Sequence, residues 1–159
     1  MDVTLRPIRD EDHDFLRRLY ASTREEELAQ ATDWSPEQKG AFLTQQFEAQ
    51  HHHYQTYYAG ASFDVVLGDD EPIGRLYVSR WEHEIRVVDV ALVPEARGRG
   101  IGSALLRDLF AEGERTGRPV SIHVERFNRA LRLYRRLGFG EIEENGPYFL
   151  MEWRPPGLT

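Results

Sequence analysis

The sequence contains no cysteine, and this absence excludes several kinds of site at once. Disulfide bonds, thiolate metal sites and cysteine nucleophiles all require a thiol. Long apolar runs are also missing. No stretch approaches the ~18 residues that a membrane-spanning helix needs, so we expect no membrane partner. The amino-terminal run MDVTLRPIRDED is acidic and alternating, unlike a secretory signal peptide, and we expect a cytoplasmic protein.

Positive charge is in short supply over the chain as a whole. The formal net charge is −7 at pH 7, which repels nucleic acid, so we expect no nucleic-acid partner. In one short segment arginines gather nevertheless, and they are Arg126, Arg129, Arg132, Arg135 and Arg136. This cluster is either a solvated helix face or an anion-binding surface.

The remaining composition is that of a globular protein. Hydrophobic residues make up 40% of the chain and charged residues 30%, which is typical of a soluble folded domain. A length of 159 residues supports one domain with one core and is short for two. We therefore predict a single domain over residues 1–159.

Apolar spacing and turn residues predict the order of the elements. We expect a strand over residues 3–8, a helix capped by Asp10, and a second helix that begins at Ser35-Pro36. The later elements are strands at about 62–68, 72–81 and 84–93, a helix over about 100–117, a strand over 118–125, a helix begun by Asn128 and ended by Gly138, and a hairpin over 139–155. Hairpins combined with one β-α-β crossover predict an α/β (α+β) fold. Its central sheet is mixed and mostly antiparallel, with helices on both faces.

Three glycines occupy every second position around the start of the helix at 100–117, and they are Gly98, Gly100 and Gly102. The first turn of a helix leaves backbone N–H groups unpaired and carries partial positive charge. Glycine permits positive φ and brings no Cβ, so this backbone can approach a phosphate or pyrophosphate closely. Further donors beside the glycines are Arg97, Arg99 and Ser103. The alternative is a glycine-rich turn before an ordinary helix.

Two well-known phosphate loops do not fit this stretch. A P-loop requires a Lys-Ser/Thr pair after its last glycine, and the run GIGSA has none. The dinucleotide fingerprint spaces its glycines differently and lies in a first β-α unit. A nucleoside-triphosphate binder is therefore a weaker alternative.

The run DVALVPEARGRGIG, followed by NRALRLYRRLGF, resembles the GNAT acyltransferase superfamily. The resemblance implies acetyl-CoA as cosubstrate. It implies that residues 97–103, Ile101 included, hold the pyrophosphate. The fourth strand would splay from the fifth, and Leu92 and Val93 would pair with the pantetheine arm through their backbones. Asn128 would bond the same arm, and the arginines at 126–136 could neighbour the 3′-phosphate.

The same resemblance assigns Tyr134 as the acid that protonates the leaving thiolate. A phenol with a pKa near ~10 is protonated at neutral pH, so it can donate. The alternative is an aromatic side chain that only packs. Asn128 lies one residue closer to Tyr134 than in many members of the family, which rotates one side chain by ~100° relative to the other.

Candidates for the base are Asp89 and His123. Asp89 lies inside the apolar run IRVVDVALV, where a buried carboxylate needs a partner or a role. His123 alternates with apolar residues on a strand, and its ordinary pKa near ~6.5 suits proton transfer. An ion pair for Asp89, a core role for His123, and a water relay are the alternatives.

By the same resemblance, the acceptor site involves residues 20–60. This segment contains carboxylates and aromatic side chains, which suit a cationic amine: Glu25, Glu26, Glu27, Trp34, Tyr54, Tyr57 and Tyr58. A solvated acidic turn and an aromatic helix end are the alternative. The run His51-His52-His53 cannot converge on one metal, because consecutive helical side chains point ~100° apart. We therefore predict no metal.

The sequence thus predicts an N-acetyltransferase. We expect it to move an acetyl group from acetyl-CoA to the primary amine of a small-molecule or peptide acceptor by direct attack. The alternative is a non-catalytic acyl-CoA-binding regulatory module, and we expect a monomer or a homodimer.

Overall fold

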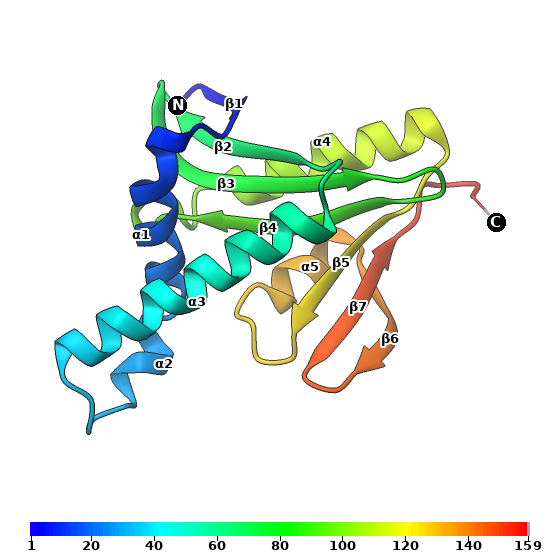
Figure 1. Cartoon of the computed structure of the whole chain (residues 1–159). Coiled ribbons are helices and arrows are strands. Elements are labelled where there is room, and N and C mark those ends of the chain that lie inside the picture. The colour runs from blue at the N-terminus through cyan, green and yellow to red at the C-terminus, as the bar shows by residue number, and fades with distance from the viewer. Residues whose placement is uncertain (159) are drawn as a thin grey trace. The chain divides into compact units, whose positions relative to one another are not determined.

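The computed structural model describes residues 1–158. Its strands are β1 (Val3–Pro7), β2 (Ser62–Gly68), β3 (Glu71–Arg80), β4 (Ile85–Leu92), β5 (Val120–Glu125), β6 (Gly140–Asn145) and β7 (Tyr148–Trp153). They form one sheet in the order β1-β2-β3-β4-β5-β7-β6 (Figure 1). β4 and β5 pair in parallel, whereas β1–β2, β5–β7 and β6–β7 pair antiparallel. The predicted mixed, mostly antiparallel sheet is confirmed.

The helices are α1 (His13–Thr23), α2 (Glu25–Ala29), α3 (Pro36–Tyr57), α4 (Ile101–Thr116) and α5 (Leu131–Leu137), with 3-10 turns at Asp10–Asp12 and Pro94–Ala96. The sequence did not predict α2, and no residue of α2 is buried, so it has no apolar spacing to detect. Within residues 1–158, no helix combines the length and the apolar character that crossing a membrane requires.

The chain comprises two compact units. The first contains residues 1–75 and 91–96, and the second contains residues 76–90 and the chain from Arg97 onward. In the first unit α1 packs against α3, and Leu16, Tyr20 and Phe47 form a buried cluster between them.

Of the two helix starts predicted in the first unit, one is confirmed. Ser35 Oγ accepts a hydrogen bond from the Gln38 N–H at 3.1 Å, and the Gln38 side chain accepts one from the Ser35 N–H at 2.8 Å. This reciprocal cap begins α3 as predicted. At α1, however, Asp10 is not the capping residue. Asp12 accepts a hydrogen bond from the Arg9 N–H at 2.7 Å and also binds the Arg6 guanidinium. Its side chain is engaged by these two partners, and the residue is 4% exposed.

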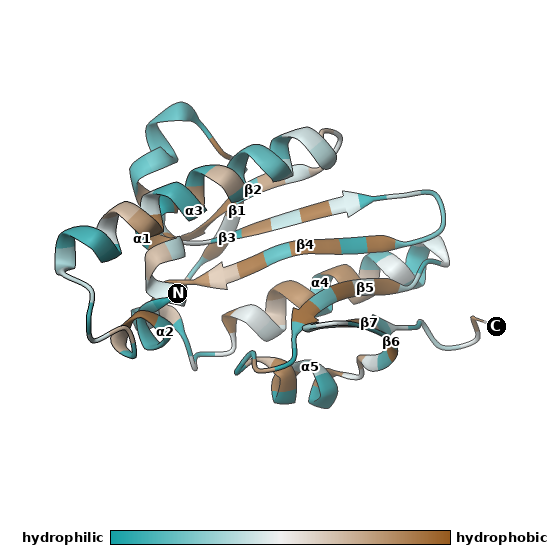
Figure 2. Cartoon of the chain, turned by 60° about the horizontal axis from the view of Figure 1, so that its bottom comes forward, coloured by the Kyte–Doolittle hydropathy of each residue, from teal (hydrophilic) through white to brown (hydrophobic). Residues whose placement is uncertain are grey.

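In the second unit α4 packs on the sheet through a buried apolar stripe of Leu105, Leu106, Leu109 and Phe110. Phe110 stacks on the Trp153 ring with a centroid separation of 4.3 Å. Hydrophilic bands interrupt the largely hydrophobic β4 (Figure 2), whose charged residues are Arg86 and Asp89. A charge within such a strand needs a partner or a role, so both residues are candidates for function.

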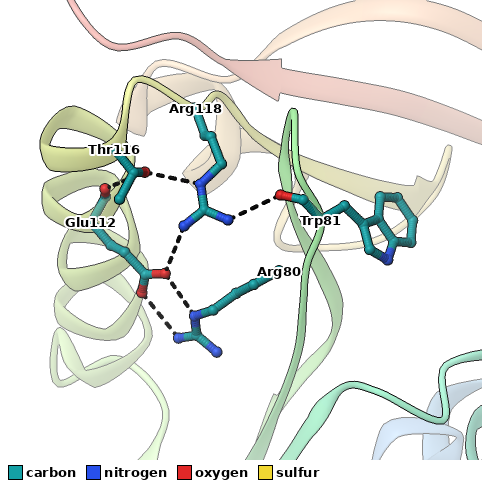
Figure 3. A network of polar contacts seen from close by, with 5 residues as sticks. All are labelled: Arg80, Trp81, Glu112, Thr116 and Arg118. Atoms are coloured by element: carbon teal, nitrogen blue, oxygen red, sulfur yellow. Dashed lines mark hydrogen bonds and ion pairs between the residues drawn. The ribbon is translucent and has the colours of Figure 1, made fainter.

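A polar network ties the carboxyl-terminal half of α4 to the residues around the end of β3 (Figure 3). Glu112 accepts hydrogen bonds from Arg80 Nε at 2.6 Å and Arg80 Nη2 at 3.0 Å. Arg118 donates to Glu112 at 3.4 Å and to the Trp81 carbonyl at 3.0 Å. This network anchors the helix whose opposite end carries the glycine loop.

Candidate functional site

The glycine loop has the backbone geometry that the sequence predicts. Gly98 and Gly100 have φ values of +74° and +81°, in the left-handed region that other residues rarely adopt. A Cβ built on Gly98, Gly100 or Gly102 meets no heavy atom within 4 Å. The positive φ angles explain why positions 98 and 100 are glycine. At Gly102 neither a positive φ nor a close neighbouring atom requires a glycine. Its missing Cβ leaves open space at the start of α4.

The backbone N–H groups of residues 100–103 have no acceptor within the described part of the chain. The first N–H of α4 with an acceptor is that of Ala104, which donates to the Gly100 carbonyl at 3.0 Å. Among residues 1–158, none accepts a hydrogen bond from the N–H groups of residues 100–103. Four adjacent donors at a helix amino terminus form a site for an anion.

Cationic side chains flank these amides. Arg99 is exposed and Arg97 is half-buried. Ser103, one turn into α4, is half-buried and carries a hydroxyl group. Residues 97–103 therefore bring backbone and side-chain donors together within one unit.

Tyr134 lies on α5 and is 5% exposed. Its ring packs edge-on against Phe139 with a centroid separation of 5.8 Å. Burial, and secondly the negative charge of nearby Asp89, raise the pKa of Tyr134 to about 12. The phenol therefore stays protonated at neutral pH and can act as a donor.

β4 and β5 separate where the resemblance implied a splay. Their parallel pairing joins Ile85–Val87 to Val120–Ile122 and extends no further among the described residues, although both strands continue. Asp89 lies on the separated part of β4 and is half-buried rather than buried. His123 is the first residue of β5 beyond the last pair. Unpaired backbone amides and carbonyls on separated strands can bind an amide-rich ligand.

The expectation for Val93 requires correction. Its N–H donates to the Ile73 carbonyl at 2.8 Å, and its own carbonyl accepts from the Ala96 N–H at 3.0 Å. Both backbone groups are therefore engaged within the first unit.

Asn128 does not begin α5, which starts at Leu131. Its Oδ1 accepts from the Ala130 N–H at 2.8 Å, and its carbonyl accepts from the Leu131 N–H at 3.1 Å. The residue thus forms a turn before the helix, because a short polar side chain can replace a helical bond to the backbone. Its exposed amide NH₂ is the part that remains for a ligand.

His123 is exposed, and its Nδ1 lies 3.2 Å from Arg86 Nη1. Burial of part of the ring, and secondly the Arg86 charge, lower the pKa of His123. The imidazole is accordingly neutral at pH 7.

The arginines between residues 126 and 136 differ in their contacts. Arg126 donates to the Gly146 carbonyl at 2.8 Å and pairs with Glu144, and Arg135 pairs with Glu141. These two arginines hold the β6–β7 hairpin. Within the described part of the chain Arg132 and Arg136 have no ion-pair partner, so they remain candidates for anion binding.

The residues proposed for the acceptor are dispersed over the first unit. Trp34 packs on Phe42 at a centroid separation of 5.2 Å, and His53 packs on Tyr57 at 4.6 Å. His51 instead stacks on Phe47 in the core of this unit. No group of three or more His, Asp or Glu side chains within residues 1–158 is placed to hold a metal ion.

Two residues that matter to the site were missed by the sequence analysis. A Cβ on Gly74 of β3 would lie 2.3 Å from the Ala91 carbonyl oxygen, so only glycine permits this approach of β4. A glycine inside a strand pattern is the signal for such an approach. Arg86 was missed because its partners depend on the pairing of β4 with β5.

Comparisons with known families agree with this geometry. Residues 12–139 match the family described as Acetyltransferase (GNAT) family. Over 72 residues the chain is 40% identical to the GCN5-like protein acetyltransferase Rv2170 of Mycobacterium tuberculosis. That match covers 44% of this chain and 33% of the relative, so the matched segment spans about a third of that protein's length.

Solved structures with the same fold include enzymes bound to coenzyme A. The PaiA N-acetyltransferase of Thermoplasma acidophilum, in complex with coenzyme A, superposes with a TM-score of 0.71 at 19% identity and covers 97% of this chain and 99% of that one. A GNAT family acetyltransferase of Elizabethkingia anophelis with acetyl-CoA bound has a TM-score of 0.58 at 18% identity, covering 96% and 97%. At these identities the likeness establishes the fold.

Proposed function

This chain belongs to the acetyltransferase (GNAT) family, and from that membership we propose that it is an N-acetyltransferase that uses acetyl-CoA. The acceptor is the primary amine of a small molecule or peptide. One observation carries the proposal. Residues 100–103 present backbone N–H groups that no described residue uses, beside glycines whose Cβ positions are open. This arrangement fits a pyrophosphate, whose oxygens accept several hydrogen bonds at once.

The proposed binding residues follow from this fit. The amides of residues 97–103 hold the pyrophosphate, with Arg97 and Arg99 as cationic neighbours. Asn128 binds the pantetheine arm through its amide NH₂ group. Acetyl-CoA supplies an activated acyl group as a thioester.

The proposed chemistry uses residues of the second unit. The neutral amine attacks the thioester carbonyl carbon, a C–N bond forms and the C–S bond breaks. Tyr134 donates a hydrogen bond to the departing sulfur. Because its raised pKa exceeds that of an ordinary thiol, ~8.5, hydrogen bonding to the thiolate is easier than complete proton transfer. The proton of the amine passes to Asp89 or to water.

Asp89 also supports the role of Tyr134. Its negative charge opposes ionisation of the phenol, which keeps the donor proton in place.

The test is a titration of the protein with coenzyme A by isothermal calorimetry, followed by a thiol-release assay with acetyl-CoA and a panel of amines. We expect saturable binding and thiol release with at least one amine. Binding without thiol release from any amine indicates a non-catalytic acyl-CoA-binding module instead. Absence of binding at a ligand concentration of about 1 mM contradicts both readings, because millimolar affinity is already weak.

A further inference from the structure

A buried arginine on β4 links β4 to β5 away from the glycine loop. Arg86 is 8% exposed and lies opposite Ser121 in the parallel register. Its Nε donates to Ser121 Oγ at 2.8 Å, and its Nη2 donates to Glu84 at 3.3 Å. Its Nη1 lies 3.2 Å from His123 Nδ1, and the guanidinium lies 5.0 Å from the centroid of the Trp81 ring. Each of the three nitrogens has its own partner, so the guanidinium is held in one orientation.

The Ser121 hydroxyl completes the support of this arginine. It accepts from Arg86 Nε and donates its own proton to Glu84. Ser121 is 1% exposed, and its hydroxyl both accepts and donates a hydrogen bond. These bonds restrict the guanidinium and the hydroxyl to one arrangement.

The contact with Arg86 determines where His123 carries its proton. An arginine side chain has only donors, so the Nδ1 atom that faces it must supply a lone pair. In the neutral imidazole the single proton is then on Nε2. Protonation of Nδ1 would place an N–H against a guanidinium N–H and two positive charges side by side.

The opposite side of the imidazole faces no hydrogen-bond partner in the described part of the chain. Among residues 1–158, none forms a hydrogen bond with His123 Nε2. The residue lies on β5 immediately beyond the last pair with β4, where the two strands separate. The Nε2–H group is therefore available to a ligand that enters this separation.

We propose that Arg86 is a positioning residue that holds neutral His123 in the Nε2–H form, so that His123 serves bound substrate as a hydrogen-bond donor and not as the base. The tautomer of His123 is a property of the free protein and does not depend on the proposed function. The donation of a hydrogen bond to substrate rests on the proposed function. This proposal removes His123 from the candidates for the base and leaves Asp89 or water.

Three charged groups near the imidazole affect the pKa of His123. Arg86 on β4 opposes protonation, whereas Glu143 on β6 and Glu84 before β4 favour it. On β7 the residue paired with His123 is the apolar Leu150. Removal of the Arg86 charge should therefore raise the titration midpoint of His123.

The first test is long-range ¹H–¹⁵N NMR of the histidine side chains, with His123 assigned by its absence in His123→Gln. In the wild type we expect the Nε2–H pattern alone. Arg86→Met should give a mixture of tautomers and a higher midpoint. Arg86→Lys keeps the charge and should keep the midpoint closer to that of the wild type. An Nδ1–H pattern in the wild type overturns the proposal, whatever the variants show.

The second test compares His123→Gln with His123→Ala in thiol release, using the best amine of the panel. Glutamine keeps an N–H donor but cannot take up a proton. For a donor role we expect His123→Ala to lose about tenfold more kcat/KM than His123→Gln, with the acid limb of the pH profile present in both. Equal losses and disappearance of that limb identify a base and overturn the proposal.

The two tests separate this inference from the proposed function. The NMR pattern is recorded on the free protein and requires no turnover. If no amine releases thiol, the NMR pattern alone decides the tautomer, and the calorimetric titration alone decides whether coenzyme A binds.

Discussion

At the scale of single residues, Tyr134 is the group whose chemistry can be isolated most cleanly. Tyr134→Phe removes the hydroxyl and retains the ring that packs on Phe139. We expect kcat to fall by about 10²-fold or more while the affinity for acetyl-CoA stays within about threefold, because the donation matters only as the thiolate leaves. Steady-state kinetics and calorimetry measure the two quantities. An unchanged kcat means that Tyr134 only packs.

The raised pKa of Tyr134 also predicts a dependence of stability on alkaline pH. Between the ordinary tyrosine pKa of ~10 and about 12, the folded state binds a proton that the unfolded state has lost. The free energy of unfolding therefore falls as pH rises through this window, by an amount on the order of 2 kcal/mol. Urea denaturation between pH 8 and about 11 should show a shallower decline in Tyr134→Phe than in the wild type. Parallel declines in the two proteins contradict the assignment.

At the scale of elements, a substitution at the start of α4 should weaken ligand binding without lowering stability. Gly102→Ala places a methyl group in open space and improves helix propensity, by up to about 1 kcal/mol. We expect a protein that is at least as stable as the wild type but binds coenzyme A at least tenfold more weakly, since the methyl group takes the space of the phosphate. Thermal denaturation and calorimetry test both parts. Undiminished affinity would place the pyrophosphate elsewhere.

A second variant of the same loop has a different physical basis. Gly100→Glu adds a negative charge and forces a side chain into left-handed backbone at φ +81°. We expect coenzyme A binding to be lost and stability to fall by about 1–2 kcal/mol. Affinity equal to that of the wild type refutes the loop assignment.

At the other end of α4, Glu112 holds the helix to the strand region. Hydrogen bonding from Arg80, against an opposing effect of burial, lowers the pKa of Glu112. Its stabilisation is therefore complete above the ordinary glutamate pKa and is lost as pH falls through the lowered value. Glu112→Gln should cost about 1–2 kcal/mol of unfolding free energy at pH 7 and flatten the acid dependence. Glu114→Gln, on an exposed position of the same helix, is the matched control, and an equal effect there contradicts the network's role.

At the scale of the whole molecule, the sequence predicts one domain, while the fold contains two compact units. If the chain unfolds as one domain, calorimetry gives a single transition whose calorimetric and van't Hoff enthalpies agree. Coenzyme A at about 100 times its Kd should then stabilise that transition by about 2.7 kcal/mol. Two transitions, only one of which responds to ligand, contradict the prediction of one domain.

Local patterns predicted most of the elements because the signals are local. Ser35-Pro36 begins α3, and Gly100 and Gly117 flank α4, as the sequence indicates. Where the expectation was wrong, another local bond competed. Asn128 bonds its own turn instead of starting α5, and Asp10 begins a 3-10 turn, in which Asp12 accepts from the Arg9 N–H, instead of capping α1.

The candidate site divides in the same way. The glycine loop and Tyr134 could be named from residue type and spacing. The engaged backbone of Val93 and the tautomer of His123 could not, because each depends on a partner from another strand.

By itself, the sequence determined which residues could expose backbone N–H groups, cap a helix or carry a proton. These properties depend on a residue and its neighbours in the sequence. Only the tertiary structure decided which donors stayed unused and which acquired a partner. Sheet register places Arg86 against Ser121 and the burial of α5 raises the pKa of Tyr134, and both depend on contacts between residues far apart in the chain.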